Sequence, residues 1–245
     1  MPASKNTRLI DLFQKSRSSQ SNAVVEGVQA LKHATRFKAK LLHVITCDIK
    51  QLNILLDKLA PDVKEDIFSE VIEVSLQTFS KLSPQPPRTN VIALAKRRMY
   101  TLADIDLVKP IVLLEDPRDL ENIGAVIRVA AAADAGAVCI TGSADIWHPA
   151  VLRGAAGLHY ALPVLNVSIE QMFKLNRPVI SLDPLGQDIV TSGIPHNTIL
   201  VFGTERYGIS PQLLSQSDSV VRIPMKQGVS SLNLATSVAA TLYRR

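Results

Sequence analysis

Residues 111–141 read IVLLEDPRDLENIGAVIRVAAAADAGAVCIT, in which a short apolar run, a polar loop, a longer apolar segment and a second short run follow one another. The runs at 111–114 and 138–141 have the length and composition of buried strands. Between them, the apolar positions of 122–135 recur at the spacing of one helix face. A strand, a helix and a strand joined by short loops are typical of a parallel sheet, since parallel neighbours need a crossover connection.

The same alternation continues beyond this stretch. Further strands are predicted near 163–165, 179–182, 199–202 and 220–223, and helices at 146–153, 211–214 and 231–243. We therefore expect an α/β domain with a mostly parallel sheet that helices cover on both faces. Ligands of such sheets bind at the carboxyl ends of the strands. Three polar clusters fall at such ends, after Leu114, Phe202 and Ile223.

The first half predicts a smaller α/β unit. A helix is expected over the apolar positions of 24–31, with Asn22 as its N-cap. Strands and helices alternate after it, with a proline-rich breaker at 83–87. The chain is thus expected to comprise four segments, namely a flexible N-terminus (1–22), the small unit (23–98), a linker (99–109) and the larger domain (110–245).

Composition excludes several classes of protein. The chain has 245 residues, of which 47% are apolar, an ordinary globular balance, and only 4% are aromatic, which argues against a wide base-stacking platform. Two cysteines, Cys47 and Cys139, are too few for a disulfide framework, and the histidines show no metal-ligand spacing. No apolar run is long enough to span a membrane. We expect a cytoplasmic protein, with an organellar transit peptide in the first 22 residues as the alternative.

The positive charge is concentrated in the first half. The formal net charge is +5; residues 1–109 hold 17 basic against 11 acidic side chains, and residues 110–245 hold 10 against 11. The density is highest at Lys96-Arg97-Arg98, with Arg88 upstream. This distribution favours a polyanion as the partner of the first half and chemistry in the second. An ordinary solvated basic surface is the alternative.

The first polar cluster, residues 115–128, ends a strand and opens a helix. Asn122 is expected at the N-cap, where its side-chain oxygen accepts a backbone N–H. Gly124 and Arg128 stand four positions apart on one helix face, and helical side chains point back toward the N-terminus. Arg128 is therefore expected to lie over the bare backbone of Gly124, beside a gap in which a nucleotide fits. An ion pair of Arg128 with Glu121 or Asp116 of the same cluster is the alternative.

The second and third clusters also follow strands. In Gly203-Thr204-Glu205-Arg206-Tyr207-Gly208-Ile209-Ser210, the glycines allow the backbone to approach a ligand closely, although a plain tight turn is the alternative. In 223–233, a glycine loop leads to Ser231-Leu232-Asn233, with Ser231 as the expected helix cap. The N–H groups of such a helix start can bind polar ligand atoms. Neither cluster is a P-loop, since no Lys-Ser or Lys-Thr follows the glycines.

Together, the clusters resemble three motifs of the SpoU/TrmH branch of the SPOUT RNA methyltransferases. The residues that carry the resemblance are Asn122-x-Gly124-x-x-x-Arg128, Gly203-x-Glu205-x-x-Gly208-Ile209-Ser210, and Ile223-Pro224-Met225 with Ser231-Leu232-Asn233. Their order and spacing cover about residues 110–245. The first half resembles the ribosomal-protein-like substrate-binding domain often fused to this family, in Val25-Glu26-Gly27, Val74-Ser75 and the strand at 91–95.

The resemblance implies a fold and a reaction. It implies an α/β trefoil knot at 110–245, a homodimer through that domain, an RNA-binding domain at 23–98, and 2′-O-methylation of a ribose in rRNA or tRNA, with the basic first half favouring rRNA. The cofactor implied is S-adenosyl-methionine, whose sulfonium activates the methyl without a metal. Cofactor contacts map onto Gly203, Ile223, Leu232 and Leu182, and the surroundings of the target nucleotide onto Arg128, Asn122, Glu205, Ser231 and Asn233.

The resemblance also implies individual roles. Arg128 is expected to activate the ribose hydroxyl or to hold a substrate phosphate, the second because a guanidinium is normally too basic to take a proton. Glu205 would orient Arg128 through a bidentate pair. Ala235 stands where many members carry a serine. Two other functions stay open: a non-catalytic RNA-binding or assembly factor that keeps the fold, and an α/β enzyme that acts on a small nucleotide.

Overall fold

A computed structural model describes residues 5–204 and 207–244, and the chain divides into two compact units. Unit 1 comprises Met1–Met99 and Trp147–Ala161; unit 2 comprises Tyr100–Ile146 and Leu162–Arg245. The chain therefore leaves unit 2 for a short segment of unit 1 and then returns, whereas the sequence predicted contiguous segments with boundaries near 98 and 110. Among the described residues, no helix has the length and apolarity needed to cross a membrane.

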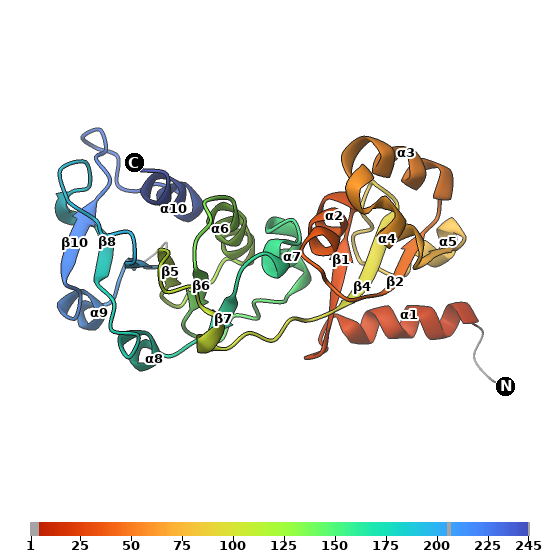
Figure 1. The fold of residues 1–245 in the computed structure, drawn as a ribbon, viewed down its shortest axis with the longest axis horizontal. Helices are drawn as coiled ribbons and strands as arrows, with labels where there is room; N and C mark the ends of the chain where they lie inside the picture. Colours follow the sequence, from red (N-terminus) through yellow and green to blue (C-terminus); the bar gives the residue numbers. More distant parts are fainter. Residues whose placement is uncertain (1–4, 205–206, 245) are drawn as a thin grey trace. The chain divides into compact units, whose positions relative to one another are not determined.

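Unit 1 is built on a four-stranded mixed sheet (Figure 1). Its strands lie in the order β1 (Asn22–Glu26), β4 (Val91–Lys96), β2 (Leu41–Thr46) and β3 (Val71–Glu73). The β2–β3 pair is parallel, and β4 runs antiparallel to both of its neighbours. The helices are α1 (Lys5–Ser16), α2 (Val28–Arg36), α3 (Ile49–Leu59), α4 (Lys64–Phe68), α5 (Leu76–Phe79) and α7 (Pro149–Gly154).

Two expectations for the beginning of the chain are wrong. Residues 5–16, expected to be flexible, form α1, because an apolar face at helical spacing packs on the core of the sheet; its members are Leu9, Ile10, Leu12 and the fully buried Phe13. Residues 22–26, expected to open a helix capped by Asn22, form β1. The valines of β1 are buried within the sheet, which suits β-branched side chains. Helix α2 begins only after Gly27, whose φ of +86° breaks the strand.

The segment Trp147–Ala161 belongs to unit 1 through specific contacts. The buried carboxylate of Glu26 on β1 accepts hydrogen bonds from Arg17 at 2.6 Å and from Arg153 of α7 at 3.2 Å. At Gly157, whose φ is +76°, a Cβ would lie 2.3 Å from the backbone carbonyl oxygen of Ala30 on α2. A buried charge needs such partners, so Glu26 ties α7 to the sheet of unit 1.

Unit 2 is a six-stranded sheet in which all described strand pairs are parallel. The strands lie in the order β10 (Ser219–Arg222), β8 (Val179–Asp188), β9 (Ile199–Phe202), β5 (Ile111–Leu114), β6 (Ala137–Ile140) and β7 (Val164–Asn166). Helices α8 (Ile169–Phe173) and α9 (Pro211–Ser215) pack on the core of one face, and α6 (Leu120–Ala132) packs against α10 (Leu234–Leu242) on the other (Figure 1). The expected α/β fold with a mostly parallel sheet is confirmed.

The segment expected as a linker is part of the core of unit 2. Ile105 is buried, and Tyr100, Leu102 and Leu107 pack against the same cluster. The cluster also contains Cys139 of β6, and burial raises the pKa of its thiol to about 12. A thiol that stays protonated is a poor nucleophile, so Cys139 is a packing residue.

Candidate active site

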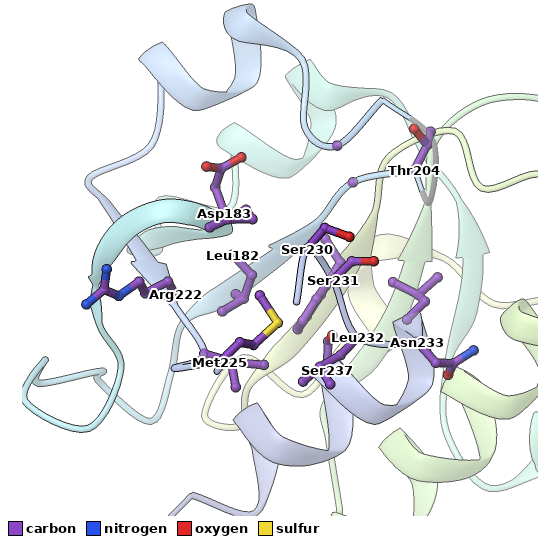
Figure 2. Close-up of a pocket in the computed structure, with 16 residues that line it drawn as sticks. Leu182, Asp183, Thr204, Arg222, Met225, Ser230, Ser231, Leu232, Asn233 and Ser237 are labelled. Carbon is purple, nitrogen blue, oxygen red and sulfur yellow. The ribbon is translucent and has the colours of Figure 1, made fainter. Parts of the chain in front are cut away.

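A pocket of about 480 Å³ opens at the carboxyl ends of β9 and β10 and beside residues 182–184 of β8 (Figure 2). This edge is where a parallel sheet places its ligands, and the volume is in the range of small-molecule sites. The lining comes from the ends of these strands, the loops after them and the start of α10; its members are Leu182, Asp183, Pro184, Phe202, Gly203, Thr204, Gly208, Arg222, Ile223, Met225, Ser230, Ser231, Leu232, Asn233, Leu234 and Ser237.

The four residues expected to contact a cofactor all line this pocket. Leu182 lies within β8, Gly203 follows β9, Ile223 follows β10, and Leu232 precedes α10. In Figure 2, Leu182 and Leu232 lie together with Met225 in the middle of the pocket, whereas Arg222 points away from it. The structure thus brings these positions together from three separate parts of the sequence, and their role as cofactor ligands stays a prediction.

The loop after β9 is closed by its own backbone. The N–H of Thr204 donates to the carbonyl of Gly208 at 3.0 Å, and the N–H of Gly208 donates to the carbonyl of Thr204 at 3.0 Å. Gly208 has a φ of +66°, and a Cβ at Gly203 would lie 2.1 Å from the carbonyl carbon of Gly208. Both positions therefore need glycine, and the loop that they form is one wall of the pocket. Glu205, expected beside the target nucleotide, lies outside the described residues.

A side-chain hydrogen bond joins the first and third motifs. The Nδ2 of Asn233 donates to the Oδ1 of Asn122 at 2.9 Å. The Oδ1 of Asn233 accepts from the backbone N–H groups of residues 235 and 236, so Asn233 is the N-cap of α10. The carboxamide of Asn233 thus caps α10 through its oxygen and binds the first turn of α6 through its nitrogen, which holds the two helix starts together. Two residues that the sequence places around the target nucleotide are thus in direct contact.

The expected helix caps are wrong at two positions. Helix α6 begins at Leu120 and is capped by Asp119, whose carboxylate accepts from the N–H groups of residues 121 and 122. Asn122 therefore lies in the first turn, which leaves its side chain available to Asn233. Helix α10 is capped by Asn233, and the exposed Ser231 lies in the loop before it, where it lines the pocket. Asp, Asn and Ser are about equally good caps, so in both cases the cap is the residue that directly precedes the first helical residue.

Arg128 lies on α6 with an exposed side chain. It is not among the residues that line the pocket, and neither is Asn122, which reaches the pocket only through Asn233. Asp116, one acidic residue considered as a partner of Arg128, instead binds Arg118 at 2.7 Å. The structure therefore leaves the expected role of Arg128 untested.

Several residues of the pocket were given no individual role from the sequence. Asp183, Thr204, Met225 and Ser230 line it, and the carboxylate of Asp183 accepts from the N–H of Leu185 at 2.9 Å. Thr204, Met225 and Ser230 follow the ends of β9 and β10, whereas Asp183 lies within β8. The sequence predicted strand ends at 182, 202 and 223, so the rule that ligands bind at strand ends already pointed to the residues after them.

Of the basic run at the end of β4, Lys96 is exposed, whereas Arg97 and Arg98 are partly buried and hydrogen-bonded to backbone carbonyls. The guanidinium of Arg98 donates to the carbonyl of Tyr160 at 2.8 Å, and to those of Phe37 at 2.7 Å and Lys38 at 3.1 Å. Arg97 donates through Nε to the carbonyl of Asn22 at 3.0 Å. Both arginines therefore hold segments of unit 1 together, and the RNA-binding role expected for this run stays a prediction.

Comparison with known proteins assigns the chain. The family model for the SpoU rRNA methylase family matches residues 109–243, which is more than half of the chain. A 23S rRNA (adenosine(1067)-2′-O)-methyltransferase of Streptomyces laurentii is 25% identical over 97% of this chain and 90% of that protein. A 23S rRNA (guanosine(2553)-2′-O)-methyltransferase of Bacillus subtilis is 24% identical over 94% of this chain and 90% of that protein.

A solved structure shares the fold along nearly the whole chain. The SpoU methyltransferase AviRb of Streptomyces viridochromogenes, in complex with the cofactor AdoMet, superposes with a TM-score of 0.78 at 22% identity, over 96% of this chain and 95% of that one. Residues 109–243, which the family model matches, contain the three motifs and the residues that line the pocket. This chain belongs to the SpoU rRNA methylase family.

Proposed function

We propose that this protein transfers the methyl group of S-adenosyl-methionine to a ribose 2′-hydroxyl of ribosomal RNA. The observation that carries the proposal is the convergence of the loops at 203–208 and 223–233 on one pocket, with Asn122 of α6 bonded to Asn233 at its edge. Membership of the SpoU rRNA methylase family and relatives named as 23S rRNA 2′-O-methyltransferases support both the reaction and the substrate class.

The pocket has the chemistry that this cofactor needs. The cofactor has a flat aromatic adenine with a polar edge, a ribose diol and a charged amino-acid end. Leu182, Ile223 and Leu232 offer apolar contacts for the adenine, while Asp183 and Ser231 offer groups that accept or donate hydrogen bonds. When bound, S-adenosyl-methionine supplies a methyl group already activated by its sulfonium.

The residues at the edge of the pocket then handle the nucleotide. A ribose hydroxyl is a weak nucleophile near neutral pH, and its attack needs the proton to be removed or the oxygen to be polarised. Asn122 and Asn233 orient the target nucleotide through their carboxamides, and Ser231 contacts it from the loop. Arg128 holds the neighbouring phosphate and polarises the hydroxyl, with Glu205 as the partner that orients its guanidinium.

The remaining assignments follow from the same proposal. Residues 110–245 carry the methyltransferase site and form a trefoil knot, and two copies associate through this domain as a homodimer. Residues 23–98 bind the RNA substrate, which agrees with the excess of basic residues in the first half. The relatives named for 23S rRNA favour rRNA over tRNA as the substrate. The protein acts in the cytoplasm, which agrees with bacterial relatives such as that of Bacillus subtilis.

Incubation of the full chain with methyl-labelled S-adenosyl-methionine and unmodified rRNA tests the proposal. We expect label in rRNA, at a single ribose whose 2′-O-methyl group resists alkaline cleavage. Label in tRNA alone would identify tRNA as the substrate in place of rRNA. Binding of the cofactor without transfer to any RNA would favour the non-catalytic assembly factor, and transfer to a free nucleotide would favour the small-molecule enzyme.

A further inference from the structure

The loop that forms one wall of the pocket is pinned at its far end by a carboxylate from another strand. The Oε2 of Glu115 accepts a hydrogen bond from the backbone N–H of Ser210 at 2.8 Å. Glu115 directly follows β5, whose neighbour β9 leads into the loop, and the N–H of Glu115 donates to the carbonyl of Phe202 at 2.9 Å. The residue thus contacts the loop at both its beginning and its end.

The geometry points to Glu115 as a positioning residue for the cofactor pocket, an inference that rests on the proposed function. Glu115 does not line the pocket itself, but Gly203, Thr204 and Gly208 do, and all three lie between its two contacts. The two backbone hydrogen bonds between residues 204 and 208 join two parts of the loop to each other. They do not fix the position of the loop relative to the sheet. The bond from Glu115 supplies that second restraint.

The bond also fixes the start of α9. Ser210 caps this helix, with its Oγ accepting from the N–H of Leu213 at 3.2 Å, while its own N–H is held by Glu115. Both partners are partly buried, so an unsatisfied N–H at Ser210 would carry a desolvation cost that favours another loop position. A loop that spends only a fraction of the time in the binding position weakens the apparent affinity for the cofactor by that fraction.

Titration of S-adenosyl-methionine into the full chain by calorimetry tests the inference without RNA or turnover. Glu115→Ala removes the acceptor, and we expect the Kd for the cofactor to rise about tenfold, the effect of losing one hydrogen bond to a charged group. Glu115→Gln keeps an acceptor oxygen, and we expect it to stay within about threefold of the wild type. The exposed carboxylate of Glu170 on α8 gives the matched control, since Glu170→Ala removes a charge from the same unit away from the pocket.

Steady-state methylation separates a positioning role from general destabilisation. Glu115→Ala should raise the KM for the cofactor about tenfold, while kcat at saturating cofactor stays within about threefold of the wild type. A lowered kcat with an unchanged KM, or an unchanged Kd in the alanine variant, would overturn the inference. If wild-type protein bound no cofactor at all, the proposed function itself would fail, and this outcome differs from a wild type that binds and a variant that binds equally well.

Discussion

The pocket loops of unit 2 and the basic run of unit 1 both stand out in the sequence, but only the first group lies where its pattern suggested. Gly203, Ile223 and Leu232 converge on one pocket. In the densest positive charge of the chain, Arg97 donates through Nε, and Arg98 through both terminal nitrogens, to backbone carbonyls of unit 1. The difference lies in what each pattern constrains. Glycines and strand ends restrict the backbone, whereas a charge count says nothing about the direction of a side chain.

The largest effect expected for the first group is at Arg128. Arg128→Ala should lower the rate of methyl transfer by more than about 100-fold, the range of a lost polarising or proton-transfer group, because it removes the guanidinium proposed to polarise the hydroxyl and hold the phosphate. The Kd for S-adenosyl-methionine should stay near the wild-type value, since Arg128 does not line the pocket. Single-turnover transfer to rRNA measures the first quantity and calorimetry the second.

Arg128→Lys serves as the comparison variant, since it keeps the charge but loses the planar fork. A large loss of cofactor affinity in Arg128→Ala would mean that the side chain reaches the pocket after all. An unchanged transfer rate would remove Arg128 from the catalytic residues.

The next largest effect is expected when a charged side chain is placed inside the pocket. Leu232 lies in the middle of the pocket, and its side chain is 39% exposed (Figure 2). Leu232→Arg should raise the Kd for the cofactor about 100-fold, because it fills the space and buries a charge against the ligand. The fold should tolerate it, since the position lies in a loop. Calorimetric titration gives the Kd, and Val229→Arg, an exposed change in the same loop that does not line the pocket, is the control. Equal binding by both variants would place the ligand elsewhere.

The parallel sheet could be predicted because short apolar runs alternate with segments of helical periodicity. Apolar strands of this kind are buried on both faces, and the helices between them supply the cover. The helix starts could not be predicted as well. Asp119 and Asn122 are both good caps, and only the position of the strand before them decides which one is used. The helix α1 was missed because a basic, serine-containing terminus hid an apolar face that Phe13 anchors in the core. The place of residues 147–161 in unit 1 depends on long-range contacts, such as that of Arg153 with Glu26, which no local pattern encodes.

Substitution of Arg98 should have a smaller effect, and it tests directly whether the basic run of unit 1 serves the fold. If its three carbonyl contacts are its main role, Arg98→Ala should destabilise unit 1 by about 2 kcal/mol, the scale of hydrogen bonds from a charged donor, and lower the Tm by roughly 4–8 °C. Calorimetric unfolding of the full chain measures the change. Arg98→Lys keeps the charge without the fork, and should remain destabilised while its affinity for RNA stays near that of the wild type. Full recovery of the Tm in Arg98→Lys would mean that only the charge of Arg98 matters and not its three carbonyl contacts.

Arg88 gives the smallest expected effect and the sharpest contrast, since its side chain is exposed in the loop before β4. If residues 23–98 bind RNA, Arg88→Ala should weaken rRNA binding a few-fold and reduce the slope of log affinity against log salt by about one, the signature of one lost phosphate contact. Its Tm should not change, because no packing is lost. Binding measured over a salt series decides the point, with Lys174→Ala, an exposed basic residue of unit 2, as control. An equal loss in both variants would mean that the RNA responds to net charge alone, and an unchanged slope in Arg88→Ala would move the RNA surface away from this loop. A loss confined to Arg88 would instead separate two kinds of arginine in one unit, one that holds the fold and one that meets the substrate.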